Sequence, residues 1–211
     1  MAAMDGSQAR WHADLAPFGA SAGALDAAHA DVARRYGEAA RHYHTMRHVE
    51  AVLAWADELL GDDVDPAVVL AAWLHDVIYD PTAHDNEAAS AVYAGEVLPA
   101  LGVPAPVVAE VRRLIELTAG HEVGEADRAG RILVDADLAI LGSPWPVYAT
   151  YAANVRQEYA HVPDEAFRPG RAAVLEGFVA RPRLFHTDAF HARFDEQARA
   201  NLGREIDELR R

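Results

Sequence analysis

Apolar residues return along the chain at the spacing of an α-helix. From residue 22 onward they recur every three or four positions, and no stretch alternates apolar and polar residues convincingly, as a half-buried strand would. The pattern predicts helices over about residues 22–39, 46–61, 66–79, 85–101, 105–119, 130–141, 145–160, 163–180 and 188–209. Because only short loops separate these segments, the sequence predicts a single all-α domain.

Residue types at the segment ends agree with this pattern. Asp65 followed by Pro66 is typical of a helix start, because aspartate caps free backbone N–H groups and proline suits the first helical position. Four glycines stand where helices should end, at Gly61, Gly102, Gly120 and Gly142.

The composition excludes several kinds of chemistry. Of the 211 residues, 33 are Asp or Glu and 19 are basic, all of them Arg, so the net charge is −14. The absence of lysine rules out a P-loop lysine and a Schiff base. The absence of cysteine rules out a thiol nucleophile, an iron–sulfur cluster and Cys-bound zinc. Any metal must therefore be bound by His, Asp or Glu.

The same composition limits the kinds of molecule that the protein could bind. Binding a nucleic-acid backbone requires a basic stripe, which this acidic chain lacks. The longest apolar run, residues 67–74, is far shorter than the roughly 20 residues that span a bilayer, and the first residues do not resemble a signal peptide. We therefore expect no nucleic-acid backbone and no membrane as partner, and a cytoplasmic location.

Two histidines mark the start of the second predicted helix. His44 and His48 are four residues apart, which on a helix places both side chains on one face. Histidines at this spacing also occur by chance in structural roles, so the pair alone does not define a site.

The third predicted helix is apolar on all sides until it reaches His75 and Asp76. A helix of that kind lies at the centre of a fold. An unpaired imidazole and carboxylate there would cost on the order of several kcal/mol. Either a metal or a hydrogen-bonded network must satisfy them.

The segment 131–141 contains two further carboxylates. Asp137 falls in an apolar stripe with Val134, Leu138 and Leu141, and we expect it to point inward, where a divalent cation would balance its charge. Asp135 lies about 200° around the same helix, and we expect it to cap or hydrogen-bond near a helix start.

Two other histidines follow weaker patterns. His121 comes directly after a helix-ending Ala-Gly and is either a surface residue or part of a pocket. His84 precedes Asp-Asn-Glu and is either part of a polar loop behind the site or simply a helix start.

In chain order, His48, His75-Asp76 and Asp137 form the pattern H…HD…D. This pattern resembles the metal-binding signature of the HD-domain superfamily of metal-dependent phosphohydrolases. The segments 43–48, 73–80, 85–87, 118–121 and 133–142 are similar to a bacterial branch of predicted HD phosphohydrolases whose substrate is undefined. The similarity covers residues 30–203, so residues 1–21 are predicted to be an N-terminal extension of one HD-type domain over residues 1–211.

The resemblance implies an all-α HD fold with His48, His75, Asp76 and Asp137 as ligands of a divalent cation, and it leaves the number of metals open. Because a second ion would have only His121 and a bridging carboxylate, we expect one tightly bound cation. Mn²⁺, Fe²⁺, Mg²⁺, Ni²⁺ and Zn²⁺ all suit these ligands. We expect hydrolysis of a phosphoester of a small phosphorylated metabolite or nucleotide by a metal-activated water.

Individual roles follow from this reaction. Asp76 counts as a catalytic residue as well as a ligand, and His44 would protonate the leaving alkoxide. Because the chain has no lysine, arginines must bind the phosphate, and the predicted substrate-binding residues are Arg47, His121, Arg171 and Arg181. A second metal would need His121, which otherwise contacts the phosphate.

Two other functions stay open from the sequence. Some HD-fold proteins resemble mixed-valence di-iron oxygenases, which use the same ligands with additional histidines. The other alternative is a non-catalytic helical module that binds a metal or a nucleotide without turnover.

Overall fold

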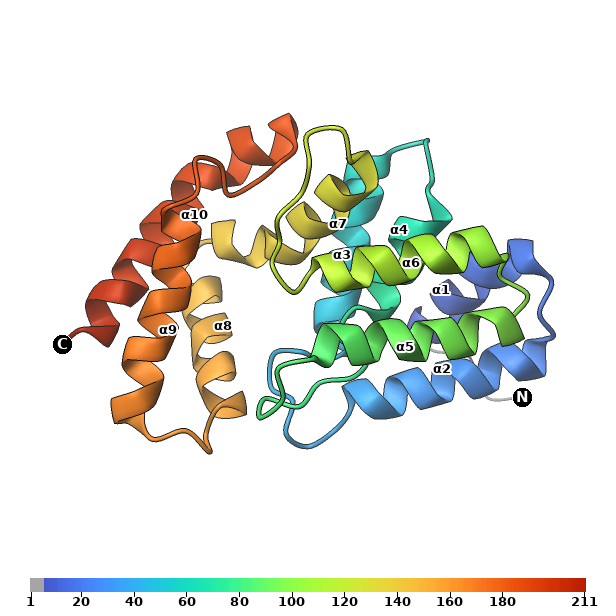
Figure 1. Ribbon diagram of the computed structural model, residues 1–211, viewed down its shortest axis with the longest axis horizontal. Coiled ribbons are helices and arrows are strands. Elements are labelled where there is room, and N and C mark those ends of the chain that lie inside the picture. Colours follow the sequence, from blue (N-terminus) through green and yellow to red (C-terminus); the bar gives the residue numbers. More distant parts are fainter. Residues whose placement is uncertain (1–5) are drawn as a thin grey trace.

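The computed structural model describes residues 6–211, and the regular secondary structure in that range consists of helices joined by loops (Figure 1). No strand occurs among these residues, so the all-α prediction is confirmed. The α-helices are α1 (Gly6–Leu15), α2 (Ala22–Tyr36), α3 (Met46–Leu60), α4 (Pro66–Leu74), α5 (Asn86–Ala100), α6 (Ala105–Leu117), α7 (Arg128–Leu138), α8 (Trp145–Glu158), α9 (Asp164–Val179) and α10 (Asp188–Leu209). Two 3₁₀ turns, η1 (Ala16–Phe18) and η2 (Ala139–Gly142), follow α1 and α7.

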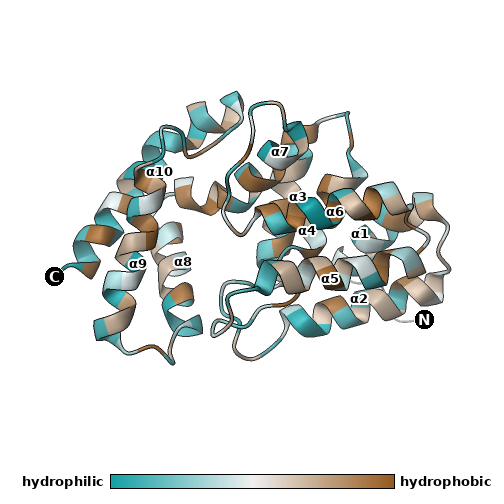
Figure 2. Cartoon of the chain, in the orientation of Figure 1, coloured by the Kyte–Doolittle hydropathy of each residue, from teal (hydrophilic) through white to brown (hydrophobic). Residues whose placement is uncertain are grey.

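The helices form two groups that meet along α3 and α7. In Figure 1, α8, α9 and α10 lie together at one end, while α1, α2, α4, α5 and α6 lie at the other, with α3 and α7 between them. Polar and apolar residues are interleaved along outer helices such as α9 and α10, as expected for helices with one face toward solvent (Figure 2). None of the helices between residues 6 and 211 combines the length and apolar character needed to cross a membrane.

Helix α7 contributes to two apolar cores. Ile132 and Leu133 are buried in the core of the first group, whereas Val134 and Leu138 are buried in the core of the second. Trp55 of α3 also packs against both cores. A polar residue on α7 can therefore lie where the two cores meet, which is the setting of Asp137.

Helix α4 lies at the centre of the first core, as its apolar sequence predicts, but it ends earlier than predicted. It stops at Leu74 rather than near residue 79, so His75 is its C-cap and Asp76 lies in the following turn. The physical reason is the buried side chain of Arg41, whose guanidinium donates to the carbonyls of Asp76 at 2.6 Å and Val77 at 3.0 Å. These bonds satisfy the backbone of a turn in place of continued helical pairing.

Helix α1 was not predicted, although it belongs to the first core. Trp11 and Leu15 are fully buried, and the ring of Trp11 meets that of Trp73 edge to face at 5.3 Å. Asp14 accepts a hydrogen bond from the Trp73 indole at 2.8 Å. The segment predicted as an N-terminal extension therefore includes a helix packed on α4, while residues 1–5 lie outside the described range.

Candidate metal centre

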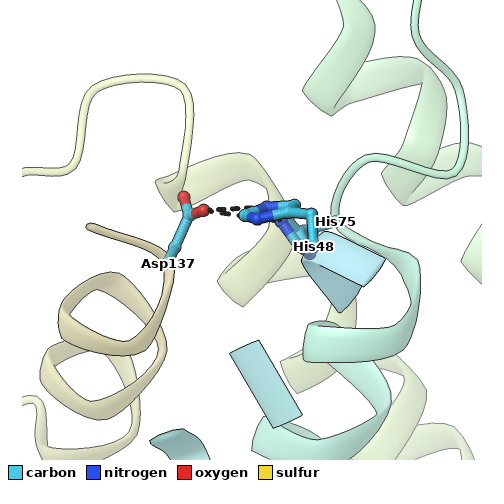
Figure 3. Close-up of side chains that lie close together, drawn as sticks. All are labelled: His48, His75 and Asp137. Carbon is cyan, nitrogen blue, oxygen red and sulfur yellow. Dashed lines mark hydrogen bonds and ion pairs between the residues drawn. The ribbon is translucent and has the colours of Figure 1, made fainter. Parts of the chain in front are cut away.

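Four side chains from three parts of the chain converge at the junction of the two cores. His48 comes from α3, His75 and Asp76 follow α4, and Asp137 comes from α7. The Nε2 atoms of the two histidines are 3.0 Å apart, and Oδ1 of Asp137 lies 3.2 Å from the His48 Nε2 and 3.6 Å from that of His75 (Figure 3). The structure thus brings together all four residues predicted as metal ligands.

Asp76 approaches the same two nitrogens. Its Oδ2 atom is 3.2 Å from Nε2 of His75 and 3.5 Å from Nε2 of His48. The tightest group is nevertheless the triad of His48, His75 and Asp137, whose ligand atoms all lie within 4.8 Å of one another. Asp76 joins this triad as a fourth residue because its carboxylate contacts both histidines.

These spacings fit ligands around one cation. Two ligands at about 2.1 Å from a metal lie about 3.0 Å apart at a right angle and about 3.4 Å apart at the tetrahedral angle. The nitrogen–nitrogen and nitrogen–oxygen distances in this cluster run from 3.0 to 3.6 Å. The three distances within the triad of His48, His75 and Asp137 therefore match those expected for ligands of one divalent ion.

The orientation of His75 supports the same fit. Its Nδ1 atom lies 3.0 Å from the carbonyl oxygen of Ala72, a hydrogen bond that only a protonated Nδ1 can make. In the neutral ring, Nε2 then carries the lone pair, and this lone pair faces the cluster. A backbone carbonyl that fixes the tautomer of a histidine in this way is usual behind metal ligands.

The electrostatics show how strongly the four groups interact. Burial disfavours protonation of His75, but the carboxylates of Asp76 and Asp137 outweigh burial and raise its pKa well above the usual range. The pKa of His48 is also raised, for the same opposing reasons. Burial acts to raise the pKa values of Asp76 and Asp137, yet the facing histidines hold both well below the usual range. Positive charge between the carboxylates is thus strongly favoured, whether from protonated imidazoles or from a cation.

His44 reaches the site from a different position than the spacing predicted. Helix α3 begins only at Met46, so His44 lies in the loop before it rather than one turn along the same helix as His48. Its ring still lies beside that of His48, with centroids 5.8 Å apart, and its Nε2 is 3.9 Å from Oδ2 of Asp76. The expectation that His44 adjoins the metal ligands is met, but the helical reasoning behind it was wrong.

Glu158, at the end of α8, holds His44 in place. Its Oε2 lies 2.7 Å from Nδ1 of His44 and accepts a hydrogen bond from the Tyr79 hydroxyl at 3.0 Å. Its Oε1 accepts three backbone N–H bonds, from residues 42, 43 and 44, at 2.7–3.0 Å. Burial acts to raise the pKa of Glu158, but the bonds from His44 and the backbone lower it to about 2.

Sequence reasoning missed Glu158. Its side chain is fully buried, and 114 residues separate it from His44. The only signal in the sequence is an acidic residue at the end of an amphipathic helix, where an acidic residue is disfavoured by the helix dipole. That signal is too common to single out one residue.

Asp135 has the hydrogen-bonding role that its position predicted. It is fully buried, and it accepts bonds from the backbone N–H groups of His186 and Thr187 at 2.6 and 2.7 Å and from the Thr187 hydroxyl. The helix start that it supports is that of α10, which Thr187 caps, rather than that of its own helix. Asp135 therefore connects α7 to α10 and takes no part in the metal cluster.

His121 contacts the cluster from the loop after α6. Its Nε2 is 2.9 Å from Oδ2 of Asp137, whereas the other oxygen, Oδ1, is the one that approaches His48 and His75. The backbone of His121 has φ 53°, a left-handed conformation that no other non-glycine residue of the described chain adopts. Arg181 holds this turn by donating to the carbonyls of Gly120 at 2.7 Å and His121 at 3.0 Å.

The structure separates the three arginines predicted to bind phosphate. Arg181 donates to the backbone of the turn at His121, as described above. Arg171 lines a cavity of about 460 Å³ together with His44, Asp76 and Asp137. Arg47 is exposed and lines a different cavity, whose wall also includes His48 and Asp137. Only Arg171 therefore shares a cavity with both His44 and the metal cluster.

The cavity beside the cluster has a mixed lining. Its walls come from the loops before α3, after α4 and after α6, from the start of α5, from the end of α7 with η2, and from α8 and α9. They include the aromatic side chains Tyr43, Tyr79, Tyr151, Tyr159 and Phe178. A volume of about 460 Å³ falls within the usual range for small-molecule sites, about 300–1,000 Å³. His84, one of the two weaker histidine candidates, lies on its exposed rim.

Comparisons with models of protein families, with curated proteins and with solved structures found no match for this chain. The resemblance to HD-domain phosphohydrolases therefore stays a prediction that rests on the residues quoted for it. The geometry of the cluster is an independent observation.

Proposed function

We propose that the protein is a metal-dependent hydrolase that cleaves a phosphoester of a small phosphorylated molecule. The observation that carries this proposal is a pair of imidazole nitrogens 3.0 Å apart, each 3.2–3.6 Å from one oxygen of Asp76 and one of Asp137, beside a cavity that His44 also lines. The resemblance to HD-domain phosphohydrolases points to the same reaction.

The four clustered residues would hold one divalent cation through Nε2 of His48, Nε2 of His75 and carboxylate oxygens of Asp76 and Asp137. Such a cation supplies Lewis-acid polarisation of a phosphoryl oxygen and makes an attacking water more acidic. His121 orients Asp137 by bonding its second oxygen, which leaves the first free for the cluster. Neutral His75 is held by Ala72 as the tautomer that can ligate.

His44 is the proton donor for the leaving group in this proposal. The Glu158 carboxylate receives the Nδ1 proton of His44, so a second proton on the ring is carried by Nε2, which faces Asp76 and the cavity. The ring is also stacked on Tyr79 at a centroid distance of 4.2 Å, so it cannot swing freely. A positioned general acid contributes about 10²–10⁴-fold to such reactions.

The decisive experiment measures bound metal first and turnover second. Elemental analysis of the purified protein should find about one transition-metal or magnesium ion per chain. A panel of phosphomonoesters and phosphodiesters, assayed with added Mn²⁺, Mg²⁺ or Ni²⁺, should then reveal hydrolysis that Asp76→Ala abolishes.

Two other results would redirect the proposal. Metal binding without hydrolysis of any ester would leave a non-catalytic binding module. Two bound irons with near-infrared absorption and oxygen consumption would favour the di-iron oxygenase.

A further inference from the structure

The cavity beside the metal centre is lined by few permanent charges. They belong to Asp76, Glu87, Asp137 and Arg171. Arginine is the only basic residue type with a permanent charge in this chain, so the wall contains one such cation against three carboxylates.

All but one of these charges are balanced nearby. Asp76 and Asp137 face the histidines and would balance a bound dication. Arg171 donates from Nε to Oε1 of Glu205 at 2.9 Å and from Nη2 to the Tyr151 hydroxyl at 3.2 Å, so its charge is matched by a buried carboxylate. With a dication bound, the charge left without a counterpart on the cavity wall is that of Glu87.

Glu87 is the second residue of α5, and its side chain is half-buried at the cavity wall. Within residues 6–211 its carboxylate has no hydrogen bond or ion pair. Its neighbour Asn86 is fully engaged, because it bonds the backbone N–H and C=O of Asp80 at 2.9 Å each. Glu87 also offsets the positive end of the α5 dipole, which would otherwise favour an anion there.

We infer that the cavity selects phosphomonoesters whose alcohol part is neutral or cationic, and that Glu87 is the residue that sets this selectivity. The inference rests on the proposed phosphoester hydrolysis, because it places the substrate's phosphoryl group at the metal cluster. The rest of the substrate then occupies the cavity toward Glu87. A carboxylate or a second phosphate there meets a like charge with no arginine free to balance it, and such pairs are strongly disfavoured in a partly dry site.

The test compares three esters of nearly equal size that differ in the charge of the alcohol part. They are 2-aminoethyl phosphate, propyl phosphate and phosphoglycolate, which carry a cation, no charge and an anion. Calorimetry on the metal-loaded protein gives Kd for each ester, and hydrolysis gives KM. Phosphoglycolate should bind at least about tenfold more weakly than 2-aminoethyl phosphate, with propyl phosphate between them.

Variants of α5 assign the effect to one residue. In Glu87→Arg, the Kd values of the two charged esters should lie within about threefold of each other or be reversed in order. In Glu87→Gln, the ratio of these Kd values should fall between those of Glu87→Arg and the wild type. Glu96→Arg is the matched control, because Glu96 is exposed on the same helix and does not line the cavity, while the change in net charge is identical. Glu96→Arg should retain the wild-type order.

The inference is overturned if phosphoglycolate binds the wild type as tightly as 2-aminoethyl phosphate. It is also overturned if Glu96→Arg reduces the difference between the two Kd values as much as Glu87→Arg does. Failure of the proposed function looks different. In that case the esters still bind in the expected order but none is hydrolysed with any metal. If none of the three esters binds, the cavity is not a phosphoester site and both conclusions fall.

Discussion

Nδ1 of His44 lies 2.7 Å from Oε2 of Glu158, and this contact joins the loop before α3 to the end of α8. The same carboxylate binds three consecutive backbone N–H groups of that loop. A single buried glutamate therefore sets both the path of the loop and the direction of the His44 ring. The position of the proposed proton donor depends on packing between the two helical groups rather than on α3.

Removal of a metal ligand should remove the metal. We expect Asp76→Ala to lose bound cation and to lower the Tm, because buried His75 loses its closest counter-charge and buried His48 loses one of its two. Elemental analysis and thermal unfolding measure both effects. Asp135→Ala is the control, since it breaks buried bonds on the same helix as Asp137 and should cost about 1–3 kcal/mol without any loss of metal. Full metal content in Asp76→Ala would contradict the ligand assignment.

His44→Ala should separate metal binding from chemistry. We expect full metal content and a loss of about 10²–10⁴-fold in kcat for alkyl phosphates. The loss should be much smaller for nitrophenyl phosphate, whose leaving group needs no proton. Equal losses on both substrates would mean that His44 positions the substrate instead.

Glu158→Gln should also lower kcat more for alkyl phosphates than for nitrophenyl phosphate, but by a smaller factor than His44→Ala does. The amide can still accept backbone N–H bonds through its oxygen, but its NH₂ group would face Nδ1 of His44 and favour the other imidazole tautomer. Tyr79→Phe removes only one donor from Glu158 and should have a small effect on kcat. A Glu158→Gln enzyme with wild-type kcat on alkyl phosphates would rule out the positioning role.

The stability contributed by Glu158 should depend on pH. Its pKa is about 2 in the folded protein, compared with an ordinary value of 4.5, so the unfolded chain binds the proton first as the pH falls. The contribution is complete above about pH 5 and is lost between about pH 4.5 and 2. The difference in Tm between wild type and Glu158→Gln should therefore shrink over that range. Glu96→Gln, an exposed substitution on α5, is the control for the change in net charge. If the difference in Tm between wild type and Glu158→Gln stayed constant with pH, the lowered pKa of Glu158 would be contradicted.

One tightly bound cation per chain is expected. Beyond the four predicted ligands the described site offers two histidines, His44 and His121, and Glu158 already bonds His44, so only His121 is left for a second ion. His121→Asn should retain that single equivalent, since asparagine tolerates the left-handed backbone at this position. Calorimetric titration of metal-free protein counts the sites. Two tight equivalents that fall to one in His121→Asn would instead establish a two-metal centre and strengthen the oxygenase alternative.

The helical class and most of the helix positions could be predicted from the sequence, and so could the four residues that we propose as metal ligands. Helical periodicity is a local property of the sequence. An apolar helix that ends in a histidine and an aspartate can also be recognised without knowing which other segments lie nearby. The position of Asp137 in an apolar stripe predicted its inward direction for the same reason. These features depend on residues within a few positions of one another.

Features that depend on contacts between distant segments became visible only in the tertiary structure. Arg41 ends α4 early by bonding carbonyls 35 and 36 residues away, and Glu158 reaches His44 across 114. Trp11 joins the first core through Trp73, although α1 is too short for its periodicity to stand out. Arg171 and Arg47 look equivalent in the sequence, yet only the packing of α9 places Arg171 in the cavity with His44. Side-chain bonds of this kind are set by how helices pack, and the local sequence pattern does not encode which helices meet.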